Sequence, residues 1–316
     1  MGLGENRGAA NHAVSQSASV KTAASRDAAR LDPADPSIEF RRAQGALMPW
    51  IESYYVYRYD AAHIDGVERV DMGQIRFLLS GRGYRTLPDG EIEPSSPVMV
   101  SGTGTAAVTY HIEGPLHVFG ASLRAIGWKA LIGRSAQEVG NHILDGVEVF
   151  GPEVLDLLER LRGLTTLEAM IAELEPMLLA RRRPVPKSHL AVARAVREWA
   201  ASGAEDVESL FRMVPMGERQ ATRLCNEYFG APPKHLQRKF RAMRAAMRIY
   251  KGASNADAAE QFADQSHMIK DIKHFTGHTP STLRAAIDPV LAASFDNETF
   301  HFLPDVIPES VDGDGG

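Results

Sequence analysis

A stretch in the last third of the chain carries polar side chains at helical spacing. Arg219, Thr222, Arg223 and Asn226 fall at positions i, i+3, i+4 and i+7, so they share one face of a helix. Guanidinium, hydroxyl and amide groups on such a face can hydrogen-bond base edges in the major groove of DNA and the phosphates beside it. A solvated helix face has a similar composition, so one such helix leaves both interpretations open.

A second stretch repeats the pattern further along. Its outward positions are mostly polar or basic: Gln265, Ser266, Ile269, Lys270 and Lys273. Its inward positions are apolar and predicted to be buried: Met268, Ile272 and Phe275. The corresponding inward positions of the first helix are Ala221, Leu224, Cys225 and Tyr228. Two matched helices favour a DNA-reading surface over two solvated faces.

Each of these helices closes a similar unit. The first unit is a helix at about 205–213, a break at 214–217 and a helix that stops at Gly230. The second is a helix at about 255–262, a break at 263–264 and a helix that stops at Gly277, 47 residues after the first stop. A helix, a tight turn and a second helix ended by glycine is the pattern of a helix-turn-helix.

The segment between the two units predicts a basic connecting helix. The basic residues expected on its exposed face are Arg238, Lys239, Arg241, Arg244, Arg248 and Lys251. The apolar positions that alternate with them at helical spacing are Leu236, Phe240, Met243 and Met247. We expect Arg238, Arg241, Arg244 and Arg248 to contact the DNA backbone, which would position the domain without reading sequence.

These residues carry a resemblance to a known family. ERQATRLCNEYFGAPPKHLQRKFRAMRAA, followed by FADQSHMIKDIKHFTGHTPSTLR, resembles the DNA-binding domain of the AraC family of transcription regulators. The most specific part is F-x-D-Q-S-H at 262–267, where His267 could contact DNA or hydrogen-bond locally, then K-x-x-x-x-F-x-G-x-T-P at 270–280. The resemblance covers about 188–287. It implies a sequence-specific regulator, an activator in our reading, that binds double-stranded DNA in two successive major grooves, as a homodimer contacting RNA polymerase.

The distribution of charge agrees with a single polyanion-binding domain. The 316-residue chain has a formal net charge of −5, but residues 1–180 carry −7, residues 181–288 carry +8 and residues 289–316 carry −6. One cysteine excludes a disulfide framework and favours a reducing compartment. No apolar run is long enough to span a bilayer, and the first thirty residues contain no secretory signal pattern. We therefore expect a cytoplasmic protein without membrane contact.

The region from 38 to 150 has the texture of an antiparallel β domain. Runs at 54–59, 74–79, 97–100, 106–111 and 116–123 predict strands, and turn signals stand at 80–83, 87–90 and 113–115. With two amphipathic helices at about 152–180, this part resembles the cupin-type sensor half of many AraC-family members. The helices either cover the β domain or form a dimer seam.

The predicted fold class is therefore α+β, with a cupin-like antiparallel β domain and its helices followed by an all-α domain with two helix-turn-helix units. The predicted divisions are 1–37 as a disordered arm, 38–180 as the sensor or dimerisation domain, 181–187 as a linker, 188–293 as the DNA-binding domain and 294–316 as an acidic tail. The tail either competes with phosphate for the basic domain or begins as an ordered extension.

The β domain either holds a small-molecule effector or serves only for dimerisation. Candidate effector contacts are Tyr55, Tyr57, Arg76, Phe77, Tyr84, His111 and Trp128, whose inward or outward direction the sequence leaves open. We expect no catalytic residue, no cofactor and no metal, since His111 and His117 lack the close spacing of a metal-binding cupin. The competing hypothesis is a cupin-like enzyme or small-molecule binding protein with a helical interaction domain.

Overall fold

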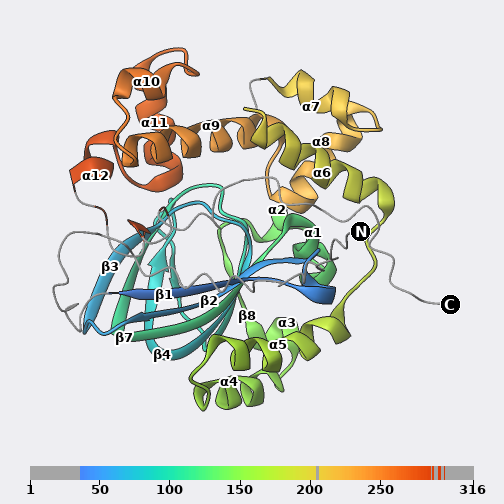
Figure 1. Ribbon diagram of the computed structural model, residues 1–316, viewed down its shortest axis with the longest axis vertical. Helices are drawn as coiled ribbons and strands as arrows, with labels where there is room; N and C mark the ends of the chain where they lie inside the picture. The colour runs from blue at the N-terminus through green and yellow to red at the C-terminus, as the bar shows by residue number, and fades with distance from the viewer. Residues whose placement is uncertain (1–35, 204–205, 286, 288–290, 293–294, 296–316) are drawn as a thin grey trace, which may run out of the picture.

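The computed structural model describes residues 36–203, 206–285, 287, 291–292 and 295. Most of the expected arm at 1–37 and of the acidic tail at 294–316 lies outside these residues. The fold is α+β, as the sequence predicts: a sheet comes first and helices follow (Figure 1). The strands are β1 (Ser37–Arg42), β2 (Ile51–Tyr59), β3 (His63–Glu68), β4 (Gln74–Thr86), β5 (Ile92–Pro94), β6 (Val98–Ser101), β7 (Val108–Leu123) and β8 (Ile143–Asp145).

The sheet is antiparallel and is organised around the long strand β7. Its order is β1-β2-β7-β4-β6-β8, with β3 paired to β7 and β5 paired to β4. The first half of β7 pairs with β3 and its second half pairs with β2, while β4 follows both halves on the other side. Strand β7 therefore pairs with β2, β3 and β4 and lies at the centre of the sheet.

Side chains alternate between the two faces of the sheet, as strand geometry requires. On β4, Ile75 and Phe77 enter the large core, whereas Leu78 enters a second, smaller cluster. On β2, Tyr54 and Val56 point to the large core, and Tyr55 and Tyr57 belong to the smaller cluster. Both faces are therefore buried, and the smaller cluster lines the inside of the curved sheet.

Two of the predicted turns are wrong. Residues 80–83 lie within β4 and residues 113–115 within β7, and the two strands remain paired there. The glycines signal irregular pairing, because the register shifts between Leu78 and Ser80 and again before Arg82. Gly81 has a φ of +88°, which other residues adopt with strain. The third signal, at 87–90, is a turn between β4 and β5, as predicted.

The helices follow the sheet in chain order. They are α1 (Ala125–Gly127), α2 (Ala136–Val139), α3 (Gly146–Phe150), α4 (Val154–Arg162), α5 (Leu167–Arg181), α6 (Lys187–Ala201), α7 (Val207–Met213), α8 (Glu218–Phe229), α9 (Pro233–Tyr250), α10 (Asn255–Ala259), α11 (Gln265–Thr276) and α12 (Pro280–Ala285). Short turns of 3-10 and π type occupy Gly45–Leu47 and Trp128–Ile132. Helix α5 ends at Arg181 and α6 begins at Lys187, so the segment predicted as a linker contains a short non-helical connection.

Helices cover the sheet at two opposite ends. Helices α4 and α5 pack beneath it, with α4 against β4 and α5 against β2, while α6 to α12 lie above it (Figure 1). The apolar stripes of α4 and α5 are buried, including Leu158, Leu161 and Leu174. These two helices therefore cover the β domain. Leu155 and Leu179 are each 39% exposed, and a dimer seam stays a prediction.

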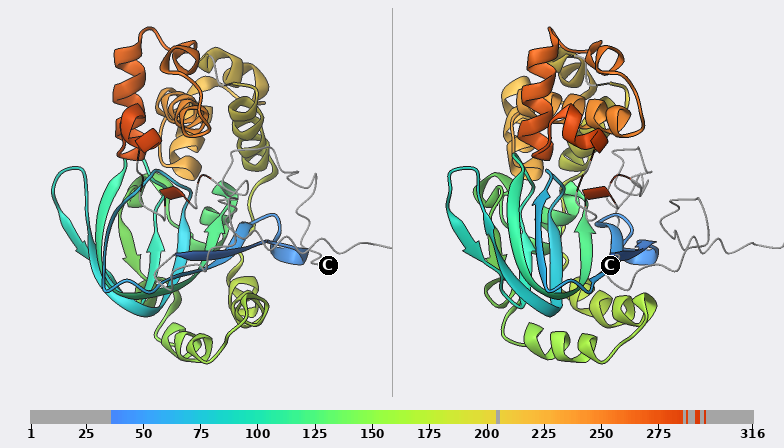
Figure 2. Two further views of the ribbon diagram at one scale, coloured as in Figure 1. Left: turned by 60° about the vertical axis from the view of Figure 1, so that its left-hand side comes forward. Right: turned by 90° about the vertical axis from the view of Figure 1, so that its left-hand side faces the viewer.

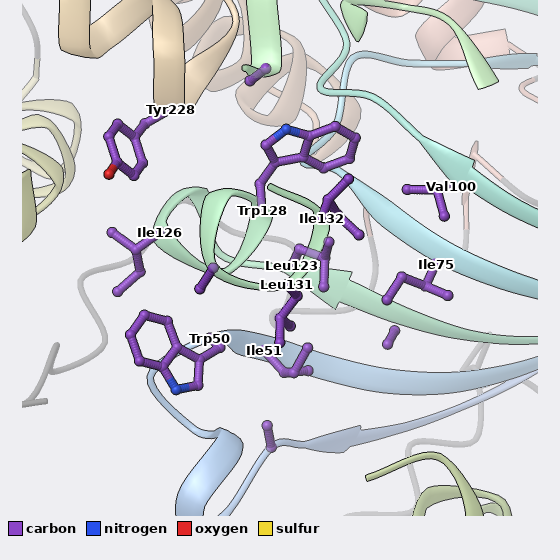
Figure 3. Packing of buried hydrophobic residues seen from close by; sticks show 14 of the residues in the cluster. Trp50, Ile51, Ile75, Val100, Leu123, Ile126, Trp128, Leu131, Ile132 and Tyr228 are labelled. Carbon is purple, nitrogen blue, oxygen red and sulfur yellow. The ribbon is translucent and has the colours of Figure 1, made fainter. Parts of the chain in front are cut away.

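The large core extends from the β domain into the helical domain. It includes Trp50 beside β2, Trp128 after α1 and Tyr228 on α8 (Figure 3). Tyr228 and Trp128 are both about 2% exposed or less. This shared core fixes the helical domain against the β domain.

Candidate nucleic-acid interface and an internal cavity

The first helix-turn-helix unit is formed by α7 and α8. The Asp206 carboxylate accepts the backbone N–H of Ser209 at 2.5 Å and so caps α7. The predicted inward face of α8 is buried: Ala221, Leu224, Cys225 and Tyr228 are at most 2% exposed. Gly230 ends α8 at a φ of +76°, the left-handed conformation predicted for a glycine stop.

The second unit is formed by α10 and α11. Ser254 and Asp257 form a reciprocal capping box at the start of α10. Asp264 caps α11 by accepting the backbone N–H of His267 at 2.8 Å, and its carboxylate also lies 2.9 Å from His267 Nδ1. His267 therefore hydrogen-bonds locally. Gly277 ends α11 at a φ of +76°, like the equivalent glycine of the first unit.

The residues predicted to read bases are largely accessible. On α8, Arg219 and Arg223 are exposed, while Thr222 and Asn226 are half-buried on a helix against which α2 packs. On α11, all of the predicted positions are exposed: Gln265, Ser266, Ile269, Lys270 and Lys273. The residues lie on the faces that the periodicity predicts, and whether they contact DNA stays a prediction.

One of these residues is tied indirectly to the β domain. Arg223 Nη1 lies 3.1 Å from the Glu227 carboxylate one turn later on α8, and the arginine side chain is still 61% exposed. Glu227 also pairs with Lys129 of the β domain at 2.9 Å. One carboxylate thus connects the candidate reading face to the β domain.

The connecting helix α9 differs from expectation. Lys239, predicted to be exposed, is 4% exposed, because α9 packs against the loops of the β domain on that side. Its ammonium donates to the Gly104 carbonyl oxygen at 3.0 Å and lies 3.5 Å from that of Asp71. Burial lowers the pKa of Lys239 to about 8, against the opposing attraction of the Asp71 carboxylate.

The arginines predicted to contact phosphate also have partners within the protein. Arg238 and Arg241 pair with the buried Asp271 of α11 at 2.7 and 3.3 Å. Arg244 donates to the carbonyl oxygens of Ala200, at 2.9 Å, and Gly203. Arg248 lies 3.7 Å from Glu260 and is the most exposed of the four. These contacts hold α9 to its neighbours, and contact with phosphate stays a prediction.

Backbone hydrogen bonds join α11 to the β domain. The N–H of Val70 donates to the Phe275 carbonyl oxygen, and the N–H of Ala107 donates to that of His274, both at 2.9 Å. On α9, His235 Nε2 donates to the Thr105 carbonyl oxygen at 3.1 Å. Burial, with a smaller effect from Lys239, lowers the pKa of His235 to about 4, so the ring is neutral near pH 7.

A cavity of about 180 Å³ lies inside the curved sheet. This is comparable to cavities of about 150 Å³ that hold a benzene-sized molecule. Its apolar wall comes from the smaller hydrophobic cluster: Tyr57, Leu78, Met99, Leu116 and Val118, among others. Its polar wall comes from the ends of β3 and β4 and includes Glu68, Gln74, Arg76 and Arg85.

The charges on the polar wall neutralise one another. The Glu68 carboxylate pairs with the guanidinium groups of Arg76 and Arg85, and Arg85 also pairs with the Glu93 carboxylate at 2.8 Å, so two carboxylates balance two guanidinium groups. Burial alone would raise the pKa of Glu68, but Arg76 and then Arg85 outweigh it and hold this pKa at about 2. Burial would lower the pKa of Arg76, and the attraction of Glu68 raises it instead. Tyr55 accepts from Arg76 Nε at 3.1 Å. A ligand would therefore meet hydrogen-bonding groups without a strong net charge.

The structure separates the candidate effector contacts into two groups. Tyr55, Tyr57, Arg76 and Tyr84 line the cavity. Phe77 and Trp128 belong to the large core, and His111 pairs with Asp65 at 2.7 Å, outside the cavity lining. Sequence reasoning missed the apolar lining residues Leu78, Met99 and Val118, which strand alternation relative to Tyr55 and Tyr57 could have indicated.

Two further sequence expectations concern reactive groups. Cys225 is fully buried in α8, and burial raises the pKa of its thiol to about 12, so it is a core residue. In the described part of the chain, no cluster of three or more His, Cys, Asp or Glu side chains has the arrangement of a metal site. Within the same part, no helix has the length and apolar character needed to cross a membrane.

Comparison with known proteins identifies the helical domain. Residues 210–286 match the family described as a helix-turn-helix domain. A search of curated proteins finds no match.

Solved structures show only a distant likeness. A crystal structure of ToxT from Vibrio cholerae O395 is 10% identical, with 73% of this chain and 97% of that chain covered at a TM-score of 0.41. Wild-type ToxT with a bound unsaturated fatty acid, from Vibrio cholerae strain SCE256, is 8% identical. The match covers 72% of this chain and 98% of that chain, with a TM-score of 0.41. The AraC-like transcriptional activator CuxR is 14% identical. The match covers 72% of this chain and 92% of that chain, with a TM-score of 0.25. Likeness at this level assigns no residue a role.

Proposed function

We propose, from the premise that residues 210–286 form a helix-turn-helix domain of the AraC type, that this protein is a sequence-specific DNA-binding regulator of transcription. The observation that carries the proposal is the repetition of the unit within one basic domain. Both second helices, α8 and α11, combine a buried apolar face with an accessible polar one. An enzyme or a binding protein would not need this duplication.

The two reading helices are proposed to enter successive major grooves. Helix α9, which connects the two units, has 18 residues and is therefore about 27 Å long at 1.5 Å per residue. Successive major grooves on one side of DNA are about 34 Å apart. A connecting helix whose length is of the same order as the groove spacing supports the proposal.

The cavity in the β domain is the proposed effector site. Aromatic and aliphatic side chains form most of its lining, and Tyr55, Gln74 and Arg76 supply hydrogen-bonding groups. Binding sites for small molecules combine these two features. Because the charges of Glu68, Arg76 and Arg85 are already paired, we propose a compact, mostly apolar and uncharged effector.

Several finer properties belong to the same proposal. Activation through RNA polymerase, a homodimer and a cytoplasmic location follow from the AraC-type domain and stay proposals. The exposed Leu155 on α4 and Leu179 on α5 offer apolar contacts for a dimer seam.

The test is binding of the purified full-length chain to fragmented genomic DNA. We expect a small set of fragments to be enriched over a control protein. With an enriched site, Arg223→Ala and Lys270→Ala should each weaken specific binding by about 1–3 kcal/mol, the value of a good base contact. Arg248→Ala should weaken all sequences about equally and reduce the salt dependence, as expected for a phosphate contact.

Two results would reject the proposal. Absence of any enriched fragment at low salt would favour the competing class, a cupin-like enzyme or small-molecule binding protein. Unchanged affinity and base preference in both Arg223→Ala and Lys270→Ala would show that neither helix face reads DNA.

A further inference from the structure

The register of three neighbouring strands arranges the wall of the effector cavity in rows. Gly120 of β7 lies opposite Tyr55 of β2 on one side and opposite Arg76 of β4 on the other. Residues two positions further along these strands share the same face of the sheet. They form an apolar row that consists of Tyr57, Val118 and Leu78. Both views of Figure 2 show the curvature of the sheet that carries these rows. Arg76 therefore lies directly beside the apolar part of the cavity wall.

The lack of a side chain at Gly120 determines the place of the Tyr55 ring. A Cβ atom at this position would overlap Cζ and the hydroxyl oxygen of Tyr55. The ring therefore lies directly against β7, where its hydroxyl donates to Gln74 Oε1 at 2.5 Å and accepts from Arg76 Nε at 3.1 Å. Burial raises the pKa of Tyr55 against the opposing effect of Arg76, so the phenol is protonated near pH 7.

Most hydrogen-bonding groups at this end of the cavity are satisfied within the protein. Arg76 Nε donates to Gln74 Oε1 at 3.0 Å as well as to Tyr55, and Arg76 Nη2 donates to Glu68 Oε1. The other oxygen of Glu68 accepts from Arg85 Nη1 at 3.3 Å. The Gln74 amide nitrogen donates to the Asp71 carboxylate at 3.2 Å. These contacts hold the Arg76 guanidinium in one orientation.

The remaining nitrogen of Arg76 is the exception. Among the residues that the structure describes, Nη1 of Arg76 has no hydrogen-bond partner. Unlike Nε of Arg85, it is also not one of the unpaired nitrogens that the protein encloses completely. Arg76 lines the cavity and its side chain is 19% exposed, so Nη1 is accessible from the cavity. Because a guanidinium group has N–H donors and no acceptor, this position can only donate.

We propose that the effector is a compact, neutral carbonyl compound, whose oxygen accepts a hydrogen bond from Nη1 of Arg76 and whose apolar part lies over Tyr57, Val118 and Leu78. This inference rests on the proposed effector site. A cavity of about 180 Å³ is large enough for one ring with a short substituent. The charge of Arg76 is already balanced by Glu68, so a carboxylate would bring an unpaired charge into the cavity. An ammonium group would place one donor against another.

The experiment compares acetophenone with ethylbenzene, which have a similar size and differ in the carbonyl oxygen. Binding is measured by titration with ligand-observed nuclear magnetic resonance. The double variant Glu68→Gln/Arg76→Met removes the donor without leaving a buried carboxylate unpaired, and Glu68→Gln alone is the matched reference that retains Arg76. We expect the double variant to bind acetophenone roughly tenfold more weakly than the reference does, the effect of one hydrogen bond from a charged donor. Ethylbenzene should bind the double variant at least as tightly as the reference.

A second measurement detects the hydrogen bond on the unmodified full-length protein. Acetophenone labelled with carbon-13 at the carbonyl reports the contact, because hydrogen-bond donation to the oxygen moves the resonance of this carbon downfield from its position in a hydrocarbon solvent. We expect the downfield position for acetophenone bound to the full chain and a hydrocarbon-like position for acetophenone bound to the double variant. Circular dichroism verifies that each variant is folded. The measurement on the full chain is decisive even where a variant is unfolded.

The results that overturn the carbonyl contact differ from those that overturn the proposed function. A hydrocarbon-like resonance in the full chain, or an equal loss of affinity for both ligands in the double variant, rejects the contact and retains the effector site. Tighter binding of benzoate than of acetophenone rejects a neutral effector. If the full chain binds neither acetophenone nor ethylbenzene, the cavity is rejected as an effector site and the contact with it. The enrichment of genomic fragments tests DNA binding separately, so its failure rejects the regulator and not the carbonyl contact.

Discussion

Replacement of the buried Lys239 by methionine should change the stability of the protein in opposite directions at neutral and alkaline pH. The Lys239 ammonium lies where α9 meets the loops of the β domain, and burial lowers its pKa from 10.5 to about 8. Methionine has a similar length and no charge. The substitution therefore removes the cost of burying the charge together with the hydrogen bonds of the amine.

The two contributions differ in size. A shift from 10.5 to about 8 corresponds to about 3 kcal/mol of destabilisation whenever Lys239 is charged in both the folded and the unfolded state. Against this, the Gly104 carbonyl oxygen loses its donor at 3.0 Å, a loss of about 1–2 kcal/mol. The Asp71 carbonyl oxygen keeps the N–H of Gly104 at 2.9 Å. At pH 7 we therefore expect Lys239→Met to be more stable by about 1–2 kcal/mol.

The sign reverses as the pH rises. The folded-state pKa of Lys239 lies below the unfolded value, so between about 8 and 10.5 the unfolded chain binds more protons. The stability contributed by this lysine therefore rises with pH across that window. Above it the burial cost has disappeared and only the lost hydrogen bond remains, so Lys239→Met should become less stable than the parent by about 1–2 kcal/mol.

Urea unfolding followed by circular dichroism, repeated from pH 7 to pH 10.5, measures both effects. Taking the difference in the free energy of unfolding between the parent and Lys239→Met cancels the contributions of titratable groups that both proteins contain. Lys234→Met is the matched control, because Lys234 lies on the same helix and is exposed, and its difference from the parent should not vary with pH. A difference for Lys239→Met that is constant with pH, or one that favours the parent at pH 7, would refute the assignment of Lys239 as a buried charge.

Three further outcomes follow from the contacts of the helical domain. Asp271→Asn should destabilise the protein by about 1–3 kcal/mol in urea unfolding, because the pairs with Arg238 and Arg241 lose their charge; an unchanged midpoint would contradict this. The free energy of unfolding should fall by about 1–2 kcal/mol as the pH is lowered from 6.5 to 4, because the folded-state pKa of His235 lies below its ordinary value and the half-buried ring is partly screened. This contribution to the loss should be absent in His235→Gln. Cys225 should react with iodoacetamide at pH 8 only upon unfolding, since its thiol is buried with a pKa of about 12; rapid alkylation of the native chain would exclude a core position.

The periodicity of α8 and α11 could be predicted from the sequence because it is a local property. Ala221, Leu224, Met268 and Ile272 fall inward at intervals of three and four residues, and all four are buried. The glycine stops at 230 and 277 have the left-handed backbone that a helix end favours. The positions of the strands could also be predicted from local sequence, although β2, β4 and β7 are longer than the runs that predicted them.

Which part of the polar side of α9 is exposed to solvent could not be predicted in the same way. Periodicity places Lys239 and Arg238 on the polar side of the helix, but it does not reveal that the β domain packs against part of that side. Lys239 is buried because the loops at 71 and 104 present carbonyl oxygens to it, and these loops are more than a hundred residues away in the chain. A local pattern contains no information about such a partner.

The sequence by itself determined the two helix-turn-helix units, their basic character and the β texture that precedes them, because propensity, capping and periodicity act over a few residues. Only the tertiary structure decided that Glu68 and Glu93 balance the charges of Arg76 and Arg85 at a cavity and that Leu291 contributes to the cavity wall. Those contacts depend on strand register and on how one domain packs against the other. Both are set by the burial of apolar surface from distant segments, which no single segment specifies.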